Sequence, residues 1–257
     1  MDQQLTTEPL LIERSGKRLS LTLNRPGSLN ALAPELVEKL IETLSGAQDV
    51  SLCVIKGMGK NFCAGFDLSD IENASDGDLL FRFLRIETLL QMIHHAAFPV
   101  VACAQGHVIG AGADLFAASW HRIAAPSAQF KMPGWNFELA LGTRRLTRLV
   151  GSDAARDLLI DTRSADAAQA REMGLVSEIV DPDEWEDSLA VLVKRCCALP
   201  KDGREHMLAL TTCDTRDADL AAIVHSAGRP GLKERILAYQ KQVADTRREK
   251  RRKVREG

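Results

Sequence analysis

Short apolar runs suited to strands alternate with longer stretches of helical periodicity, and this alternation constrains the fold more than any other feature. The leucines of LSLTL alternate with polar residues and follow a turn signal (SGK), so residues 9–23 are predicted to form a two-stranded hairpin. Apolar residues recur at helical spacing over 36–44, and a short apolar run follows at 52–55. The order strand, helix, strand predicts a layered α/β fold.

The same order continues along the chain. Further helices are predicted over about 79–93, 111–119, 143–160 and 165–173, and further strands over 99–103, 122–124 and 176–180. From about residue 183 onward the pattern is helical throughout. The basic run at 247–255 has no interleaved aromatic residues, so we interpret it as a solvated helix end and assign it no chemistry.

Composition argues against several classes of function. With 257 residues, 45% of them hydrophobic, the chain can bury one large domain, or one domain with a helical appendage. A formal charge of only -2 gives no field that would favour nucleic acid or an acidic membrane as the main partner. The six cysteines lack paired spacing, the N-terminus lacks a signal-peptide pattern, and no apolar run approaches the roughly 20 residues of a membrane span. We therefore expect a cytoplasmic protein with reduced thiols that binds a small or locally charged ligand.

Two segments rich in glycine and alanine follow predicted strands, at 61–68 (NFCAGFDL) and 106–115 (GHVIGAGADL). Small residues let a ligand approach the backbone, and a turn that opens a helix leaves N–H groups free to bind an anion or a carbonyl oxygen. Two such turns can form an oxyanion hole with two donors. Either segment alone is more typical of tight packing in a strand-to-helix turn.

Taken with their surroundings, these segments resemble the crotonase (enoyl-CoA hydratase/isomerase) superfamily. The resemblance rests on NRP at 24–26 with NAL at 30–32, on the two segments above, and on the stretches at 125–130, 145–151 and 165–176. It covers residues 9–180 with specific motifs and the helical remainder loosely. It implies an α/β fold with a spiral of β-β-α repeats over 1–195, and a C-terminal helical region over 196–257 that serves trimer contacts and ends in the basic tail.

The resemblance also implies coenzyme A thioesters as ligands, with no cofactor beyond the coenzyme A of the substrate and no metal. In the family two backbone N–H groups hold the thioester carbonyl, and these match Ala64 and Ala111. The matching substrate and coenzyme A contacts are Ala64, Phe66, Asp67, Leu68, Gly110 and Trp135. Family members act in fatty acid metabolism as homotrimers, some paired into hexamers. Their last helices cross onto a neighbouring subunit, and the apolar residues between Leu220 and Tyr239 would supply that surface here.

The acid/base positions depart from the hydratase pattern. Hydratases of this family use two glutamates on a water molecule; the first position is Asp114 here, and the second matches Gly134. The loop over 133–145 is shorter than in hydratases, so Glu138 is a candidate second carboxylate, against an ordinary solvated or ion-paired role. Asp114 lies on the first turn of a predicted helix, either as the catalytic acid/base or as a charge that complements the helix dipole.

Three functions are compatible with these residues. The first is an acyl-CoA enzyme that stabilises a thioester enolate and moves a proton with Asp114, in hydration, isomerisation or a related lyase step. The second cleaves a carbon–carbon bond of a β-dicarbonyl substrate with an aspartate and a histidine, for which the candidates are His94, His95, His107 and His121. The third is an acyl-CoA-binding protein without catalysis.

Overall fold

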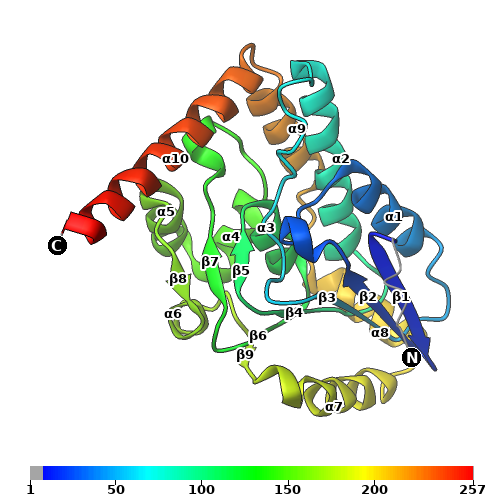
Figure 1. The fold of residues 1–257 in the computed structure, drawn as a ribbon. Coiled ribbons are helices and arrows are strands. Elements are labelled where there is room, and N and C mark those ends of the chain that lie inside the picture. The colour runs from blue at the N-terminus through cyan, green and yellow to red at the C-terminus, as the bar shows by residue number, and fades with distance from the viewer. Residues whose placement is uncertain (1–7, 257) are drawn as a thin grey trace.

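A six-stranded sheet forms the centre of the computed structural model, which describes residues 8–256 (Figure 1). Its strand order is β1 (Leu10–Ser15), β2 (Arg18–Leu23), β3 (Leu52–Gly57), β4 (Val100–Ala104), β6 (His121–Ala124) and β9 (Glu178–Ile179). The β1–β2 hairpin is antiparallel, as predicted, and every later pairing in this sheet is parallel. A smaller sheet joins β5 (His107–Ile109), β7 (Gln129–Lys131) and β8 (Ala165–Asp166). Strands β5 and β7, three residues each, are absent from the sequence prediction because they are too short to show a period.

Helices cover both faces of the main sheet and extend beyond it (Figure 1). They are α1 (Pro34–Ser45), α2 (Asp76–His94), α3 (Ala111–Ala118), α4 (Thr143–Val150), α5 (Ser152–Asp161), α6 (Ala167–Glu172), α7 (Trp185–Cys197), α8 (Lys201–Thr211), α9 (Arg216–Ala227) and α10 (Leu232–Glu256). Short 3-10 turns occur at η1 (Pro26–Ser28), η2 (Gly134–Phe137) and η3 (Pro182–Glu184). The single helix predicted over 143–160 is two helices, because Gly151 between them has a φ of 81° that continues neither.

Alternate residues of the parallel strands point to opposite faces of the sheet and pack into two separate hydrophobic cores. In β3, Cys53 and Ile55 join the larger core with α1, α2 and α3, whereas Leu52 and Val54 join a smaller core on the opposite face. Helix α7 covers that second face through Trp185 and neighbouring apolar residues. Strands that are buried on both faces form continuous apolar runs, which is why 52–55 and 99–103 were recognisable.

The C-terminal helices share the larger core with the spiral instead of forming a separate unit. Ile223 of α9 and Leu232 and Ile236 of α10 are at most 1% exposed and belong to the same cluster as the strands. The Asp76 carboxylate at the start of α2 accepts hydrogen bonds from Gly231 N, just before α10, at 2.8 Å and from the first two N–H groups of α10. Part of the apolar surface expected to dock on a neighbouring subunit is therefore used within the chain, whereas Leu220 and Val224 are exposed. Docking on a neighbouring subunit stays a prediction.

Cysteines in the described residues form no disulfide. Cys53, Cys63 and Cys103 are buried in apolar surroundings, and burial raises the pKa of each thiol to about 12. They behave as core residues, as predicted. Cys197 and Cys213 are exposed.

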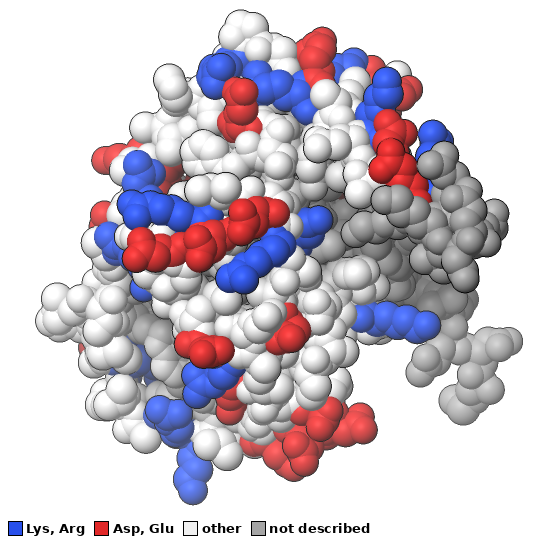
Figure 2. All heavy atoms as spheres, turned by 90° about the vertical axis from the view of Figure 1, so that its left-hand side faces the viewer, with Lys and Arg blue, Asp and Glu red and all other residues white. Residues whose placement is uncertain are grey.

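Charges of both signs are mixed on the face of the molecule shown in Figure 2. In the view of Figure 2, lysine and arginine lie next to aspartate and glutamate, and no broad area of the described residues carries one sign alone. Within residues 8–256, none of the helices combines the length and apolar character needed to cross a membrane. The side chains of the basic run at 247–255 lie mostly outside the described residues, although α10 itself continues to Glu256.

Candidate active site

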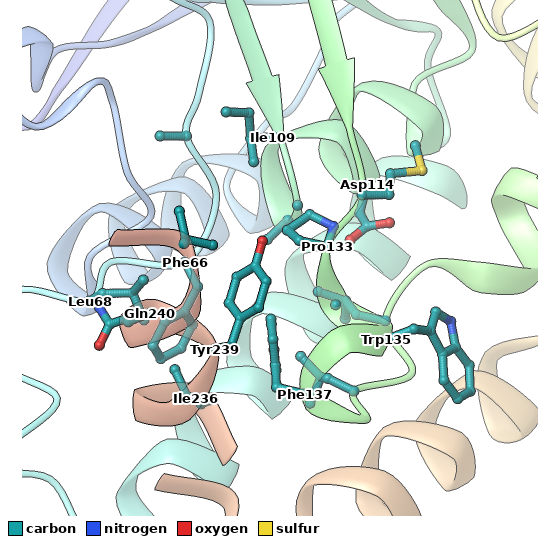
Figure 3. A pocket seen from close by; sticks show the side chains of 18 of the residues that line it. Phe66, Leu68, Ile109, Asp114, Pro133, Trp135, Phe137, Ile236, Tyr239 and Gln240 are labelled. Atoms are coloured by element: carbon teal, nitrogen blue, oxygen red, sulfur yellow. The ribbon is translucent and has the colours of Figure 1, made fainter. Parts of the chain in front are cut away.

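A pocket of about 460 Å³ opens where the start of α3, the η2 turn and α10 meet (Figure 3). Its walls are mostly apolar. The pocket brings together seven of the residues predicted from sequence: Ala64, Phe66, Leu68, Gly110, Ala111, Asp114 and Trp135. Asp67 and Glu138 do not line it.

The two segments rich in glycine and alanine pack directly against each other. Ile109 N donates to the Cys63 carbonyl at 3.0 Å, and Cys63 N donates to the His107 carbonyl at 3.1 Å. Gly65 has a φ of 88°, and a Cβ there would lie 2.5 Å from the Ile109 carbonyl oxygen and 3.1 Å from Ala111 N. Only glycine permits this approach, which brings the Gly65–Phe66 peptide beside the first turn of α3.

The free N–H groups at this junction differ from the predicted pair. Ala64 N donates to the Leu29 carbonyl at 3.0 Å, so that donor is already used inside the protein. Within the described residues, the N–H groups of Phe66 and of Ala111, the first residue of α3, have no acceptor. The Phe66 ring stacks on Phe83 with centroids 4.2 Å apart, which fixes the backbone beside it. Ala64 N is therefore already paired, and Phe66 N is the unpaired donor beside Ala111 N in the described residues.

Asp114 lies one turn into α3 with its side chain at the pocket wall and only 8% of the residue exposed. Among the described residues nothing donates a hydrogen bond to its carboxyl group. Gly142 faces it so closely that a Cβ at that position would lie 2.0 Å from Oδ1. Burial raises the pKa of Asp114 to about 8; the Arg145 charge opposes this shift and the Glu87 charge adds to it.

A buried group of charges lies behind Asp114. Arg145 of α4 makes hydrogen bonds of 2.5 and 3.1 Å to the Glu87 carboxylate of α2 and one of 3.2 Å to Asp219 of α9. All three side chains are at most 7% exposed. The Arg145 guanidinium is shared by two carboxylates, and it also gives Asp114 its nearest positive charge. The network joins three helices around the acid/base candidate.

The structure does not bring Glu138 into the pocket. Its Oε2 lies 2.6 Å from Arg229 Nη1, and both side chains are about half exposed. The residue ends η2 in the left-handed region, with φ 60°, and this turns the side chain outward. The ion-paired role, open from the sequence, is the one observed. Gly134 begins the same turn and supplies no side chain.

Asp67 is held in an ion pair instead of facing the pocket. Its Oδ2 lies 2.7 Å from Arg25 Nη1, and its side chain is 7% exposed. Burial disfavours the charge, but hydrogen bonds from Ser69 and Arg25 outweigh this and hold the pKa of Asp67 below its ordinary value. Leu68 and Phe66 line the pocket on either side of it in sequence. The Asp67 side chain therefore does not face the pocket, and the coenzyme A contact expected along 66–68 stays a prediction.

The histidines do not form a partner for Asp114. His107 is the pocket-lining histidine, and it is exposed at the end of β5. His94 contacts the Ala118 carbonyl at 3.3 Å, and burial, with Arg145 nearby, lowers its pKa to about 4. His121 pairs with Glu178 at 3.0 Å. Across the described residues, no three His, Cys, Asp or Glu side chains are grouped to hold a metal ion.

Helix α10 contributes pocket residues that the sequence did not reveal. Ile236, Tyr239 and Gln240 line the same pocket as Asp114 (Figure 3). Their amphipathic spacing predicts an apolar helix face but not what that face covers. Trp135 also lines the pocket, with its indole nitrogen donating to Thr143 Oγ1 at 3.2 Å.

Comparison with known proteins decides the family. The family model described as "Enoyl-CoA hydratase/isomerase" matches residues 14–252. The chain belongs to the enoyl-CoA hydratase/isomerase family. This confirms the resemblance to crotonases and the α/β fold expected from it, including the C-terminal helical region.

Individual relatives agree with this family. The enoyl-CoA hydratase EchA19 of Mycobacterium tuberculosis is 32% identical over 183 residues, which cover 67% of this chain and 68% of that protein. A crystal structure described as an enoyl-CoA hydratase/isomerase, from Bordetella parapertussis, superimposes with a TM-score of 0.90 at 42% identity, covering 91% of this chain and 99% of that one. A hydratase-family structure from Thermobifida fusca YX in complex with acetoacetyl-CoA has a TM-score of 0.74 at 25% identity, covering 87% and 94%.

Proposed function

We propose that this enzyme forms thioester enolates from enoyl-CoA substrates and relocates a proton within them, so that it isomerises double bonds in preference to adding water. One observation carries the proposal. Asp114 is the carboxylate that lines the pocket in the described residues. Two unpaired N–H groups lie beside it: Ala111 N begins its helix, α3, and Phe66 N belongs to the segment packed against that turn. Hydration asks two groups to handle protons, whereas relocation needs one that removes and returns a proton.

In this proposal the thioester oxygen accepts hydrogen bonds from Phe66 N and Ala111 N. Charge develops on that oxygen as the enolate forms, and removal of one such donor typically costs about 3 to 4 kcal/mol of transition-state stabilisation. Asp114 takes the proton from the carbon next to the thioester. Its raised pKa, about 8, makes it a stronger base than an ordinary aspartate once it is ionised.

The acyl-CoA part of the proposal has separate support. The family description and the acetoacetyl-CoA complex of a structural relative both point to coenzyme A thioesters. Phe66, Leu68 and Ile236 give the pocket an apolar wall suited to an acyl or pantetheine chain. Assembly as a homotrimer or hexamer remains a prediction; the exposed Leu220 and Val224 of α9 offer apolar surface for it. A monomer mass by light scattering at micromolar concentration would refute it.

The test is incubation of the protein with 3-hexenoyl-CoA, 2-hexenoyl-CoA and a β-dicarbonyl acyl-CoA, with products separated by chromatography and weighed by mass spectrometry. We expect the 3-enoyl thioester to convert to its 2-enoyl isomer with no change of mass, and Asp114→Asn to stop the conversion. A mass gain of one water would show hydration, and loss of an acyl fragment would show carbon–carbon cleavage. Binding without any product would show a non-catalytic acyl-CoA-binding protein.

A further inference from the structure

Helix α10 places the only tyrosine of the chain in the active-site pocket. Figure 3 shows the Tyr239 ring between Phe66 and Phe137, with its hydroxyl directed into the pocket toward Ile109 and Pro133. Tyr239 comes from α10 and Asp114 from α3, so the two side chains reach the pocket from different helices. A phenol can donate a proton, because its ordinary pKa lies near 10 and it is protonated at neutral pH.

The Tyr239 ring and the helix that carries it are held by several contacts. The Tyr239 ring packs on Phe137 with centroids 5.5 Å apart at 45°. One turn earlier on the same helix face, Arg235 Nε donates to the Phe137 carbonyl at 3.2 Å, and Ile236 is 1% exposed. Together with the Asp76 cap at its start, these contacts hold α10 over the η2 turn.

Tyr239 also packs on the turn that carries Gly134, the position at which the second carboxylate is missing. The turn on which its ring packs begins at Gly134, the position that lacks a side chain, and ends at Phe137. Glu138, the next residue, is withdrawn by Arg229. Among the described pocket-lining residues, the other side chains that readily exchange protons are Asp114 and the exposed His107.

We propose that Tyr239 is the second catalytic acid/base of this site and delivers the proton that Asp114 does not. The inference rests on the function proposed above and divides its proton transfer between two groups: Asp114 acts at C2 and Tyr239 acts at C4. Neither group activates water at C3, so hydration stays disfavoured. In the step, ionised Asp114 removes a proton from C2, and the electron pair moves onto the thioester oxygen to give a dienolate. The Tyr239 O–H bond then breaks and a C4–H bond forms, while the double bond moves to C2–C3. A proton passing from Asp114 to the phenolate through water restores both groups, so no net proton is consumed.

The experiment compares the wild type, Tyr239→Phe and Asp114→Asn with 3-hexenoyl-CoA in deuterium oxide. NMR follows two quantities: deuterium entering C2 of the remaining substrate, and formation of the 2-enoyl product. We expect Tyr239→Phe to lose about a hundredfold or more in product formation, the usual contribution of a positioned acid, while exchange at C2 persists. Asp114→Asn should lose both. The matched control is Thr246→Ala, which removes an exposed hydroxyl from the same helix outside the pocket.

The outcomes separate the two proposals. If the wild type shows neither exchange nor product, the proposed function fails before Tyr239 is tested. If the wild type is active and Tyr239→Phe retains its product rate, or loses exchange and product together, the role of Tyr239 is refuted.

A second measurement does not depend on the variant. Phenolate absorbance reports this one tyrosine alone, so alkaline titration of the wild type with and without butyryl-CoA should show a shifted midpoint. An unchanged midpoint would contradict contact with the substrate.

Discussion

Asp114→Asn should stabilise the protein while it removes activity, and the gain should grow with pH. Asp114 is 8% exposed as a residue, and burial raises the pKa of its carboxyl group to about 8 from an unfolded value near 4. The pKa of Asp114 is higher in the folded than in the unfolded protein, so ionisation of this group lowers the free energy of unfolding. Its contribution to that free energy is at its full value below about pH 4 and falls as pH rises toward 8. Asparagine has the same shape and no charge, so it does not share this loss.

The size of the effect follows from the shift. Stability of the wild type relative to Asp114→Asn should fall by up to about 1.4 kcal/mol per pH unit, or about 4 kcal/mol between pH 5 and pH 8. Urea unfolding followed by tryptophan fluorescence at four pH values and one protein concentration measures this difference. Asp157→Asn, an exposed substitution on α5, is the matched control and should change stability by less than about 0.5 kcal/mol at every pH. A constant gap between wild type and Asp114→Asn across the range would show that Asp114 is already ionised in the folded protein.

Three further predictions follow from the site. The kcat/KM for isomerisation should rise with pH through an apparent pKa of about 8 as Asp114 ionises, and a flat profile between pH 6 and 9.5 would exclude it as the base. Ala111→Pro removes one N–H donor at the first position of α3, where proline suits the helix, so kcat should fall by about a hundred- to a thousandfold in folded protein; unchanged turnover would refute that donor. Glu138→Gln should leave kcat within about twofold, because the side chain is a surface group paired with Arg229, and a large loss would return Glu138 to the mechanism.

Sequence patterns predicted the elements in which the order of apolar and polar residues reflects local structure or burial. The hairpin and the buried strands at 52–55 and 99–103 follow from such patterns. The placement of Ala111 and Asp114 on one pocket was implied by the resemblance to crotonases. Asp114 was recognisable because a carboxylate within an apolar stretch must be functional or paired.

Other features depend on contacts between distant residues. Whether Ala64 or Phe66 offers a free N–H depends on the Leu29 carbonyl and on the turn at Gly65. The outward position of Glu138 depends on Arg229, which lies on a different part of the chain. Helix α10 shows an apolar face in sequence, but only the packing of Tyr239 on Phe137 shows that this face closes its own pocket. The spacing of apolar residues along a helix does not specify which distant segment the helix packs against.

The central claim is that one carboxylate lines this pocket, where hydratases of the family use two. Its most direct test is the ratio of two rates for the same protein preparation: hydration of crotonyl-CoA, and isomerisation of 3-hexenoyl-CoA. We predict that isomerisation is measurable and that hydration is slower by about a hundred- to ten-thousandfold, the usual contribution of a positioned acid or base. Hydration of crotonyl-CoA with a kcat/KM above roughly a million per molar per second, as in a well-evolved enzyme, would contradict the claim.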